Sequence, residues 1–418
     1  MQPRSTDTAR TPWPLILSAA AILMITMGSR QSLGLFVAPI GAVTGLGIVH
    51  ISFALAVGQF VWGAVQPLFG AVADQYGAGR VLVLGTVMLA LGLAATPFAH
   101  SQLALLGTLG VLAAAGAGAG SFSILIGATA ARLPAAGRSF ASGLINAGGS
   151  VGQFVFAPAA QALIAAFGWV HALFALAAST ALTLPLIAGL APGATPPAAP
   201  AAAGAHAALR AQLRAALTDR SYLLLNAGFF TCGVHIAFLV THLPGEVALC
   251  GLPARVSANS LALIGLFNIA GSLTAGALGS RCRMKYVLAA MYASRTLIIG
   301  AYLLAPRTPL TFYLFSAALG FSWLATVPPT AGLVGKLFGT RYLGTLFGLT
   351  LLSHQVGGFF GAWLGGLAIA RFGDYGWMWH ADMALAGLAA LLCLPIREAA
   401  PRAQPPQVER GGTQAQPA

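Results

Sequence analysis

The feature that most constrains this chain is a succession of apolar runs, each about 20 residues long and separated by short polar segments. A helix of that length spans the hydrocarbon core of a bilayer. Twelve such runs are predicted, and an even number puts both ends of the chain on one side of the membrane. The predicted spans are 13–37, 48–73, 80–99, 103–130, 139–165, 171–191, 222–243, 257–279, 286–305, 310–334, 344–369 and 379–395.

The composition supports a membrane environment. Charged residues make up 7% of the chain and hydrophobic residues 58%, with a mean hydropathy of +0.83. A soluble domain contains roughly 25% charged residues. A chain this apolar cannot cover itself with polar surface, so we expect an all-α integral membrane protein surrounded by membrane lipid. The 52 glycines agree with this, because small residues let spanning helices approach closely.

The net charge of +13 reflects topology. Of the 21 basic residues, sixteen fall in segments on the side of the two termini, three in the opposite loops and two inside spans. Cytoplasmic loops carry an excess of Lys and Arg, so we expect both termini in the cytoplasm and a multi-pass protein of a bacterial inner (plasma) membrane. This pattern predicts no nucleic-acid partner, although it allows some attraction to anionic lipid headgroups.

A Pro- and Ala-rich stretch follows the sixth span. Such segments form linkers rather than packed cores, and the Pro/Gln-rich end of the chain is predicted to be disordered. The expected organisation is a cytoplasmic tail at 1–12, a six-helix bundle at 13–191, a cytoplasmic linker at 192–221, a second six-helix bundle at 222–395 and a disordered cytoplasmic tail at 396–418.

The two halves repeat one another at an offset of 205 residues. This offset pairs Gly152 of span five with Gly357 of span eleven, and it pairs Arg30 of span one with His235 of span seven. If both members of the second pair line the pathway, they face each other across it. Parallel repeats of six spans are typical of secondary transporters, in which the substrate binds near the midplane between the halves.

The loop after span two contains a recognisable motif, formed by Gly70, Asp74, Gly77 and Arg80. Its acid can cap a helix end, and its glycines permit a tight turn. Placed after the second of twelve spans, the motif resembles the signature loop of the major facilitator superfamily, although Gln75 stands where a basic residue is usual. The resemblance covers residues 13–395 and implies the major facilitator fold, with twelve transmembrane helices in two six-helix bundles.

Within that superfamily the chain is most similar to the branch of monocarboxylate transporters and oxalate/formate antiporters. Four stretches carry the similarity: Leu35–Pro39, Gly58–Gln59 with Gln66–Pro67, Arg138–Gly143 with Ala147–Ser150 and Pro158, and Phe347–Gly348 with Ser353–His354. The resemblance implies that His354 occupies the place of a basic residue that helps to bind a dicarboxylate. It also implies that Arg30 stands close to the span-one lysine of monocarboxylate transporters. The branch's basic residue in span eight is missing, because Ser272 and its neighbours stand there.

Arg30 is the residue on which the functional prediction rests. It lies roughly 24 Å along the first span at 1.5 Å per residue, at a depth where an unpaired charge is costly. It either faces a water-filled cavity and binds an anion, or extends to the outer interface. In the superfamily that the chain resembles, spans one, four, seven and ten line the cavity, which favours the anion site.

Other polar side chains inside the spans are further substrate-binding candidates. Arg295 of span nine is either a substrate ligand or a structural partner of backbone carbonyls. His235 is either a core histidine or a cavity residue, and a histidine titrates near neutrality and could carry a coupled proton. His354 and Gln355, in the middle of span eleven, form part of the site or bond a neighbouring helix. The uncharged or aromatic candidates are Gln31, Gln59, Ser121, Asn146, Asn268, Trp323 and Thr326.

The acidic residues sharpen this prediction. All eight are expected in loops, at span ends or in tails, and Asp382 is the only one close to a span. The membrane interior would then contain two arginines and no clear carboxylate, and a buried arginine needs an anion. The substrate is expected to supply the negative charge, which argues against cationic substrates.

We find no constellation typical of an enzyme. The four cysteines lack metal or redox spacing, and there is no nucleotide-binding loop, so neither a metal nor a cofactor is expected. The sequence predicts a secondary active transporter of small organic anions, either mono- or dicarboxylates, that works by alternating access as a monomer. Proton coupling and exchange both stay open. The alternative is a major facilitator exporter of drugs or hydrophobic metabolites.

Overall fold

The N-terminal half of the protein is a bundle of helices. This computed structural model describes residues 13–130, 132–133, 135–190, 205–339 and 342–398, and every regular element within them is helical. The elements of this half are α1 (Trp13–Gln31), η1 (Leu33–Phe36), α2 (Val37–Thr44), α3 (Ile48–Tyr76), α4 (Ala78–Ala95), η2 (Thr96–Phe98), α5 (Gln102–Leu105), η3 (Leu106–Ala113), α6 (Ala114–Ala119), α7 (Phe122–Ala130), α8 (Ala135–Ala181) and α9 (Thr183–Leu190).

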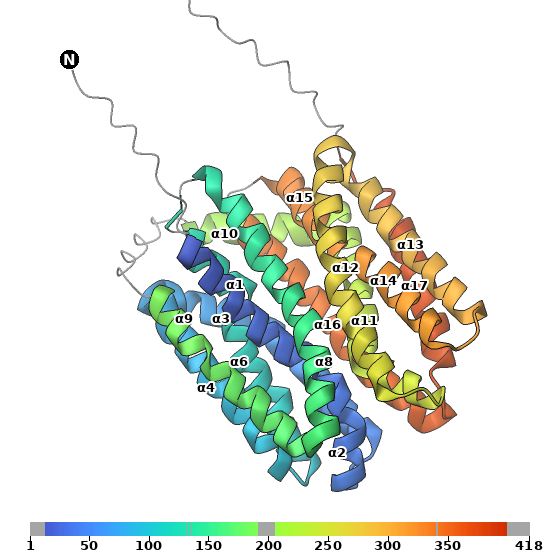
Figure 1. Cartoon of the computed structure of the whole chain (residues 1–418). Helices are drawn as coiled ribbons and strands as arrows, with labels where there is room; N and C mark the ends of the chain where they lie inside the picture. Colours follow the sequence, from blue (N-terminus) through green and yellow to red (C-terminus); the bar gives the residue numbers. More distant parts are fainter. Residues whose placement is uncertain (1–12, 131, 134, 191–204, 340–341, 399–418) are drawn as a thin grey trace, which may run out of the picture.

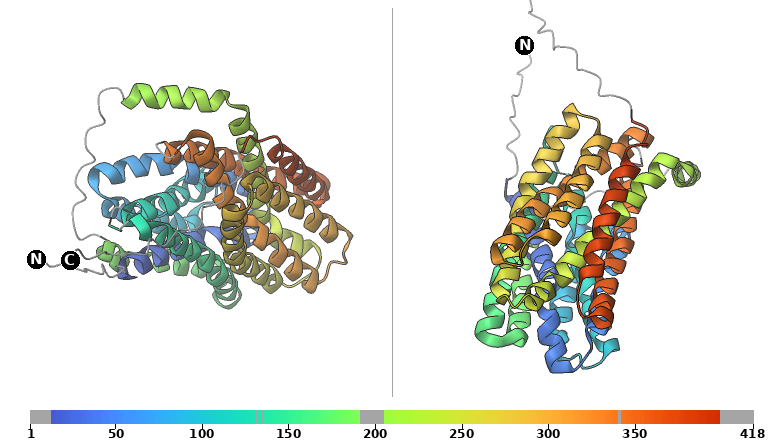
Figure 2. Two further views of the ribbon diagram at one scale, coloured as in Figure 1. Left: turned by 90° about the horizontal axis from the view of Figure 1, so that it is seen from above. Right: turned by 90° about the vertical axis from the view of Figure 1, so that its right-hand side faces the viewer.

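The C-terminal half is a second helical bundle, preceded by α10. Helix α10 occupies part of the predicted linker and runs across one end of the molecule (Figure 2). The elements of this half are α10 (Ala205–Thr218), α11 (Arg220–Leu249), α12 (Ala254–Arg281), α13 (Met284–Leu304), α14 (Pro309–Trp323), η4 (Leu324–Thr326), α15 (Val327–Phe338), α16 (Leu343–Phe372) and α17 (Gly376–Cys393).

The helices agree with the predicted number of spans. Among the described residues, nine continuous helical segments are long and apolar enough to cross a membrane. One of them, Ala141–Leu190, is divided at Gly168, whose φ of 81° is not helical. Together with α16 and α17 these segments are consistent with twelve spans. Several spans are composite: the first continues through η1 into α2, and the tenth is α14, η4 and α15.

The two bundles lie side by side (Figure 1). Helix α3 packs along α16, and α8 packs along α12, so these two pairs form most of the boundary between the halves. We call the end that carries the α3–α4 and α12–α13 turns the basic end, because Arg80, Arg281, Arg283 and Lys285 lie there. The opposite end, which carries α2 and the α11–α12 turn, is the far end.

Equivalent glycines hold equivalent helix pairs together in the two halves. A Cβ atom on Gly152 of α8 would lie 2.2 Å from the carbonyl oxygen of Met24 on α1. A Cβ atom on Gly357 of α16 would lie 2.0 Å from the carbonyl oxygen of Phe230 on α11. Only glycine allows backbones to approach this closely. The repeat read from the sequence is therefore also a repeat of packing.

The signature-like loop joins α3 to α4 at the basic end. Gly77 has a φ of 91°, a conformation that favours glycine, and it links the two helices without any longer connection. Arg80 is exposed in the first turn of α4. The side chain of Asp74 lies outside the described residues, as do the predicted tail at 1–12, the first part of the linker at 191–204 and most of the C-terminal tail at 399–418.

Candidate functional site

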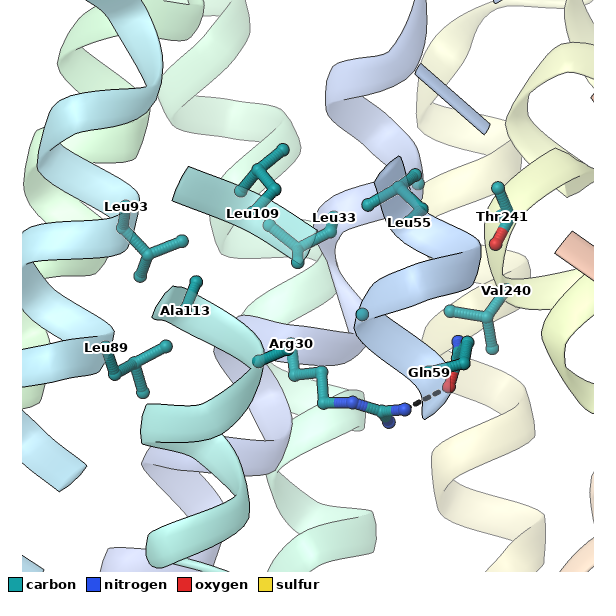
Figure 3. A pocket seen from close by; sticks show the side chains of 13 residues that line it. Arg30, Leu33, Leu55, Gln59, Leu89, Leu93, Leu109, Ala113, Val240 and Thr241 are labelled. Atoms are coloured by element: carbon teal, nitrogen blue, oxygen red, sulfur yellow. Dashed lines mark hydrogen bonds between the residues drawn. The ribbon is translucent and has the colours of Figure 1, made fainter. Parts of the chain in front are cut away.

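Arg30 lies in the last turn of α1, and its side chain is half-buried between helices (Figure 3). Its guanidinium donates a hydrogen bond to the side-chain oxygen of Gln59 on α3 and lies 4.3 Å from the ring centre of Trp62. Gln59 and Trp62 are three residues apart and share one face of α3. None of the described acids forms an ion pair with Arg30.

A small cavity of about 30 Å³ lies beside Arg30. It is large enough for about two water molecules. The lining comes from both halves, because Val240 and Thr241 of α11 lie on the same side of the cavity as Gln59, and Arg30 extends toward that side (Figure 3). Leucine side chains of α3, α4 and η3 form much of the remaining wall. The arginine therefore faces a small space at the boundary between the halves.

Helix α16 brings two predicted site residues to the same boundary. Gln355 is buried against Gly63 of α3, where an added Cβ atom would lie 2.3 Å from its side chain. The neighbouring His354 is half-buried, and its Nδ1 atom accepts a hydrogen bond from the Gln355 amide nitrogen over 3.2 Å. Its ring centre lies 4.9 Å from that of Phe229. One helical turn farther along α16, Gly358 faces the side chain of Gln59. The α3–α16 contact thus carries polar groups from both halves.

Arg295 has a different environment, inside the C-terminal half. Its guanidinium donates hydrogen bonds to the carbonyl oxygens of Ser322 and Trp323 over 2.7 and 2.9 Å, and it lies 3.1 Å from the sulfur of Cys232. The side chain is 1% exposed. Two backbone carbonyls at the α14–η4 junction, which are left free by the break in the helix, receive the charge. This geometry corresponds to the structural alternative given for Arg295.

His235 points into the C-terminal half, where its Nδ1 atom forms a hydrogen-bonded ion pair with Asp382 of α17. The two side chains are 2% and 1% exposed. The expectation that no clear carboxylate lies inside the membrane region is therefore wrong. Helix α17 begins at Gly376, three residues before the predicted span, so Asp382 lies about two turns inside the helix. The pairing also orients His235 away from Arg30.

Glu246 is a second buried acid. It lies in the last turns of α11 and accepts a hydrogen bond from the hydroxyl of Tyr302 over 2.7 Å. Helix α11 continues to Leu249, beyond the predicted end of span seven, which carries this acid into a packed position. Hydropathy alone predicted the end of span seven too early. Polar residues near the end of a span lower the mean hydropathy there, although the helix continues.

Four of the uncharged or aromatic candidates have separate surroundings. Asn268 of α12 is buried and accepts a hydrogen bond from the backbone of Leu324. Gln31 follows Arg30, and its side-chain oxygen is buried without a partner among the described residues. Trp323 is buried beside Arg295, while Asn146 is half-buried on α8. In the described part of the chain, no hydrogen bond joins any of these four residues to Arg30.

Two residues that contact predicted site residues were not themselves predicted to belong to the site. Trp62 stacks on Arg30, and Asp382 binds His235. The first could have been found from its spacing, because it lies three residues after Gln59 on the same helical face. The second could not, because it depends on how α17 packs against α11.

The close contacts between the halves gather at the far end and in the middle of the helices. A Cβ atom on Gly34 of η1 would lie 2.0 Å from the carbonyl oxygen of Val240, and one on Gly366 would lie 2.5 Å from the side chain of Ser52. Phe53 of α3 packs edge-on against Phe359 and Trp363 of α16, each at 5.9 Å between ring centres. These contacts close the boundary between Arg30 and the far end.

Comparisons with known proteins agree with this arrangement. Monocarboxylate transporter 13 of Rattus norvegicus is 27% identical over 393 residues, covering 92% of this chain and 89% of that protein. Monocarboxylate transporter 11 of Mus musculus is 31% identical over 182 residues, covering 43% and 40%. The uncharacterized MFS-type transporter YcxA of Bacillus subtilis is 23% identical over 371 residues, covering 86% and 88%.

A solved structure shows the same fold. The crystal structure of a D-xylose-proton symporter matches with a TM-score of 0.72 and 14% sequence identity, covering 92% of this chain and 97% of that one. The family model of the Major Facilitator Superfamily matches residues 19–362, which confirms the predicted superfamily. With two helical bundles facing one another across a boundary that carries a half-buried arginine, the chain belongs to the Major Facilitator Superfamily and is a multi-pass membrane transporter, not an enzyme.

Proposed function

We propose that this transporter carries small organic anions, mono- or dicarboxylates, by alternating access, and that Arg30 binds the carboxylate. The observation that carries the proposal is the environment of Arg30. Its charge is half-buried at the boundary between the halves and is held by an amide oxygen and an aromatic ring, without a described acid. A guanidinium can bind a carboxylate through two parallel hydrogen bonds. The substrate supplies the missing negative charge.

The surrounding groups suit a carboxylate-bearing ligand. Gln59 can rotate from Arg30 and donate its amide hydrogens to a bound anion. Trp62 covers one face of the guanidinium, which restricts its orientation. Gln355 and His354 extend the polar surface from the other half, so an anion held between Arg30 and α16 would contact both bundles. The printed names of the monocarboxylate transporters among the relatives support this substrate class.

Topology follows from the charge pattern. We propose that the basic end is cytoplasmic, since cytoplasmic loops concentrate Lys and Arg. The far end, which the Gly34–Val240 and Ser52–Gly366 contacts close, then faces the outside. The structure would accordingly be an inward-facing or occluded state, and the outward-facing state requires these contacts to separate.

A second candidate is export of hydrophobic metabolites. It is favoured by a mostly apolar cavity of about 540 Å³ between the halves near the far end. Its lining includes Leu35, Ile51, Ile164, Ala248, Leu252 and Tyr375. Cavities of this size and character accommodate drug-sized apolar molecules. Ligand-induced thermal stabilisation of the purified protein distinguishes the candidates, because a ligand that binds the folded state stabilises it.

The test is uptake into proteoliposomes loaded with no other solute. The probes are radiolabelled acetate, lactate, pyruvate, oxalate and succinate. Arg30→Gln should reduce uptake of the transported anion at least about tenfold, because one charge-assisted hydrogen-bond pair contributes about 1.5–3 kcal/mol. Arg255→Gln is the matched control, since Arg255 is exposed in the first turn of α12, at the far end of the molecule. Unchanged uptake by Arg30→Gln at equal reconstitution would sink the anion proposal, and stabilisation by apolar compounds alone would favour the exporter.

A further inference from the structure

We propose that His235 and Asp382 form a proton-binding site in the C-terminal half, separate from the anion site, and that the pair takes up one proton with each anion carried. This inference rests on the proposed anion transport. The site lies between α11 and α17, and it would make the transporter a proton–anion symporter rather than an exchanger. No group is oxidised or reduced: a proton moves from water to the pair, and it leaves to water on the other side.

The geometry is that of a hydrogen-bonded pair of a histidine and a carboxylate. His235 Nδ1 contacts Asp382 Oδ2, while His235 Nε2 and Asp382 Oδ1 are buried without a partner among the described residues. With one proton on the pair its net charge is zero, whether the proton is on the carboxylate or the imidazole. Without that proton the net charge is −1. Buried groups strongly favour the neutral arrangement unless a compensating charge is near.

Arg295 can supply the compensating charge. Cys232 lies three residues before His235 on the same face of α11, and its sulfur is 3.1 Å from Arg295. The guanidinium stays protonated throughout, and its described partners are carbonyls, a serine hydroxyl and this sulfur rather than an acid. A positive charge bound to a residue one helical turn from His235 would stabilise the deprotonated pair. The site can therefore exist in both states, which a transported proton requires.

The pair is closed toward the far end by aromatic rings. Trp379, one turn before Asp382 on α17, packs 4.9 Å from Phe238 and 4.8 Å from Tyr302 between ring centres. Phe315 covers another side of the same indole at 5.5 Å. These rings separate the pair from the far-end surface. In this state a proton can approach from the boundary between the halves rather than from the far end.

A route from that boundary is visible in the polar side chains. His354 is half-buried at the boundary, and its backbone packs closely against α11, because a Cβ atom on Gly233, two residues before His235, would lie 1.8 Å from the carbonyl oxygen of His354. The ionisable groups on the surrounding elements are therefore few. Toward the basic end they are Cys232 of α11, His354 of α16, Tyr292 and Arg295 of α13, and Cys393 of α17; toward the far end they are His242, Glu246, Tyr302, Arg307 and Tyr375. The buried faces of α12 and α14 add only serine and asparagine side chains.

Protonation of this pair can act on the anion site through α11. The same helix contacts η1 through the Gly34–Val240 approach, which helps to close the far end. When the His235–Asp382 pair is protonated and neutral, it joins α11 to α17 without unbalanced charge. When the pair is deprotonated, its negative charge attracts Arg295 and, with it, the α14–η4 junction. Because substrate at Arg30 lies on the other side of α11, both ligands bias the position of one helix, which is the requirement for coupling.

The first experiment detects the proton itself and needs no transported substrate. Infrared difference spectra of the purified protein are recorded from about pH 5 to pH 9, the range in which a histidine-linked proton is exchanged. We expect a band of the protonated pair, either a carboxyl stretch or an imidazolium ring mode, that disappears as the pH rises and that is lost or shifted in Asp382→Asn. Asp382→Glu keeps a carboxyl group and should shift the midpoint of the band, so the assignment does not depend on the asparagine variant alone. Asp374→Asn is the control, because Asp374 is exposed at the start of α17.

The second experiment separates coupling from binding. In proteoliposomes, wild type should accumulate the anion about tenfold for each unit of pH gradient, because one coupled proton contributes a tenfold ratio per pH unit. Asp382→Asn should lose this accumulation while it still exchanges labelled for unlabelled anion. Asp382→Glu should restore accumulation. Gradient-driven accumulation by Asp382→Asn equal to that of wild type overturns the proposal, as does a band of the protonated pair that this substitution leaves unchanged.

The two proposals fail in different ways. If wild type carries none of the five carboxylates, anion transport fails, while the infrared band still decides whether the pair binds a proton. If wild type exchanges a carboxylate without responding to a pH gradient, anion transport stands and the proton site fails.

Discussion

The guanidinium of Arg30 on α1 is hydrogen-bonded to the amide oxygen of Gln59 on α3, so a buried cation at the boundary between two bundles is held by a neutral partner. An amide oxygen stabilises the charge without neutralising it. The attraction of Arg30 for an anion therefore remains available to a bound ligand. This relationship distinguishes Arg30 from the other arginine inside the spans, which is tied to backbone carbonyls.

Replacing Gln59 by glutamate should inhibit transport. The new carboxylate would form a permanent ion pair with Arg30 and compete with the substrate. We expect the apparent KM for the transported anion to rise about tenfold or more, since a charge-assisted bond contributes about 1.5–3 kcal/mol. Thermal stability should be unchanged or raised. Concentration-dependent uptake measures this, and Gln75→Glu, an exposed site at the end of α3, is the control. A variant with wild-type KM would contradict the role of Arg30.

Replacing Arg295 by lysine should destabilise the protein without removing anion binding. A lysine cannot reach two carbonyl oxygens and a sulfur in the fixed geometry of the guanidinium. We expect a loss of about 1–3 kcal/mol in the free energy of unfolding, the usual cost of an unsatisfied buried group. Thermal unfolding with and without the transported carboxylate is the measurement. The opposite pattern, normal stability with no response to carboxylate, would make Arg295 the principal anion ligand.

Replacing Gly34 by alanine should open the far end. The added methyl carbon would lie 2.0 Å from the carbonyl oxygen of Val240, and backbone atoms there cannot give way as a flexible side chain can. The population should shift from the far-closed state toward one in which η1 and α11 are apart. A cysteine placed at Thr241 should react faster with a membrane-impermeant maleimide added from the far side. Gly107→Ala is the control because its added atom meets nothing within 4 Å, and an unchanged labelling rate would exclude this gate.

Glu398 gives a pH dependence at the basic end. It follows α17, accepts hydrogen bonds from the first amides of α13, Met284 and Lys285, and pairs with Lys336 of α15 over 2.7 Å. Burial raises the pKa of Glu398, but the bonds from Lys336 and the two amides outweigh it and lower that pKa below its ordinary value. The folded state therefore favours the carboxylate. Its stabilisation is complete above the pKa of the unfolded chain and is lost as the pH falls through the lowered folded value.

Glu398→Gln should accordingly lower the thermal unfolding midpoint near neutral pH. The difference from wild type should shrink as the pH falls through the lowered pKa of Glu398, where the wild-type carboxylate becomes protonated. Lys336→Met and the double variant complete a cycle that isolates the ion pair from the helix cap. A difference between wild type and Glu398→Gln that does not vary with pH would mean that the amide bonds alone, and not the charge, hold this end of the chain.

Much of the architecture was readable along the chain. The spans, the repeat and the concentration of Arg and Lys at one end follow from hydropathy and charge, which are local properties of consecutive residues. Arg30 and His354 could also be selected locally, because a charged or ionisable side chain inside an apolar run is costly unless it is used. The same argument selected Arg295, but it could not say which arginine faced the boundary.

The partners were decided only by the tertiary structure. Arg30 and Gln59 are 29 residues apart, and His235 and Asp382 are 147 apart. Their contacts depend on which faces of α1, α3, α11 and α17 meet, and on α17 beginning one turn earlier than its hydropathy indicated. The sequence by itself determined that charges lie in the membrane, because each residue carries its own hydration cost. Packing determined which of them are neutralised, because neutralisation is a property of pairs of residues that only the folded chain brings together.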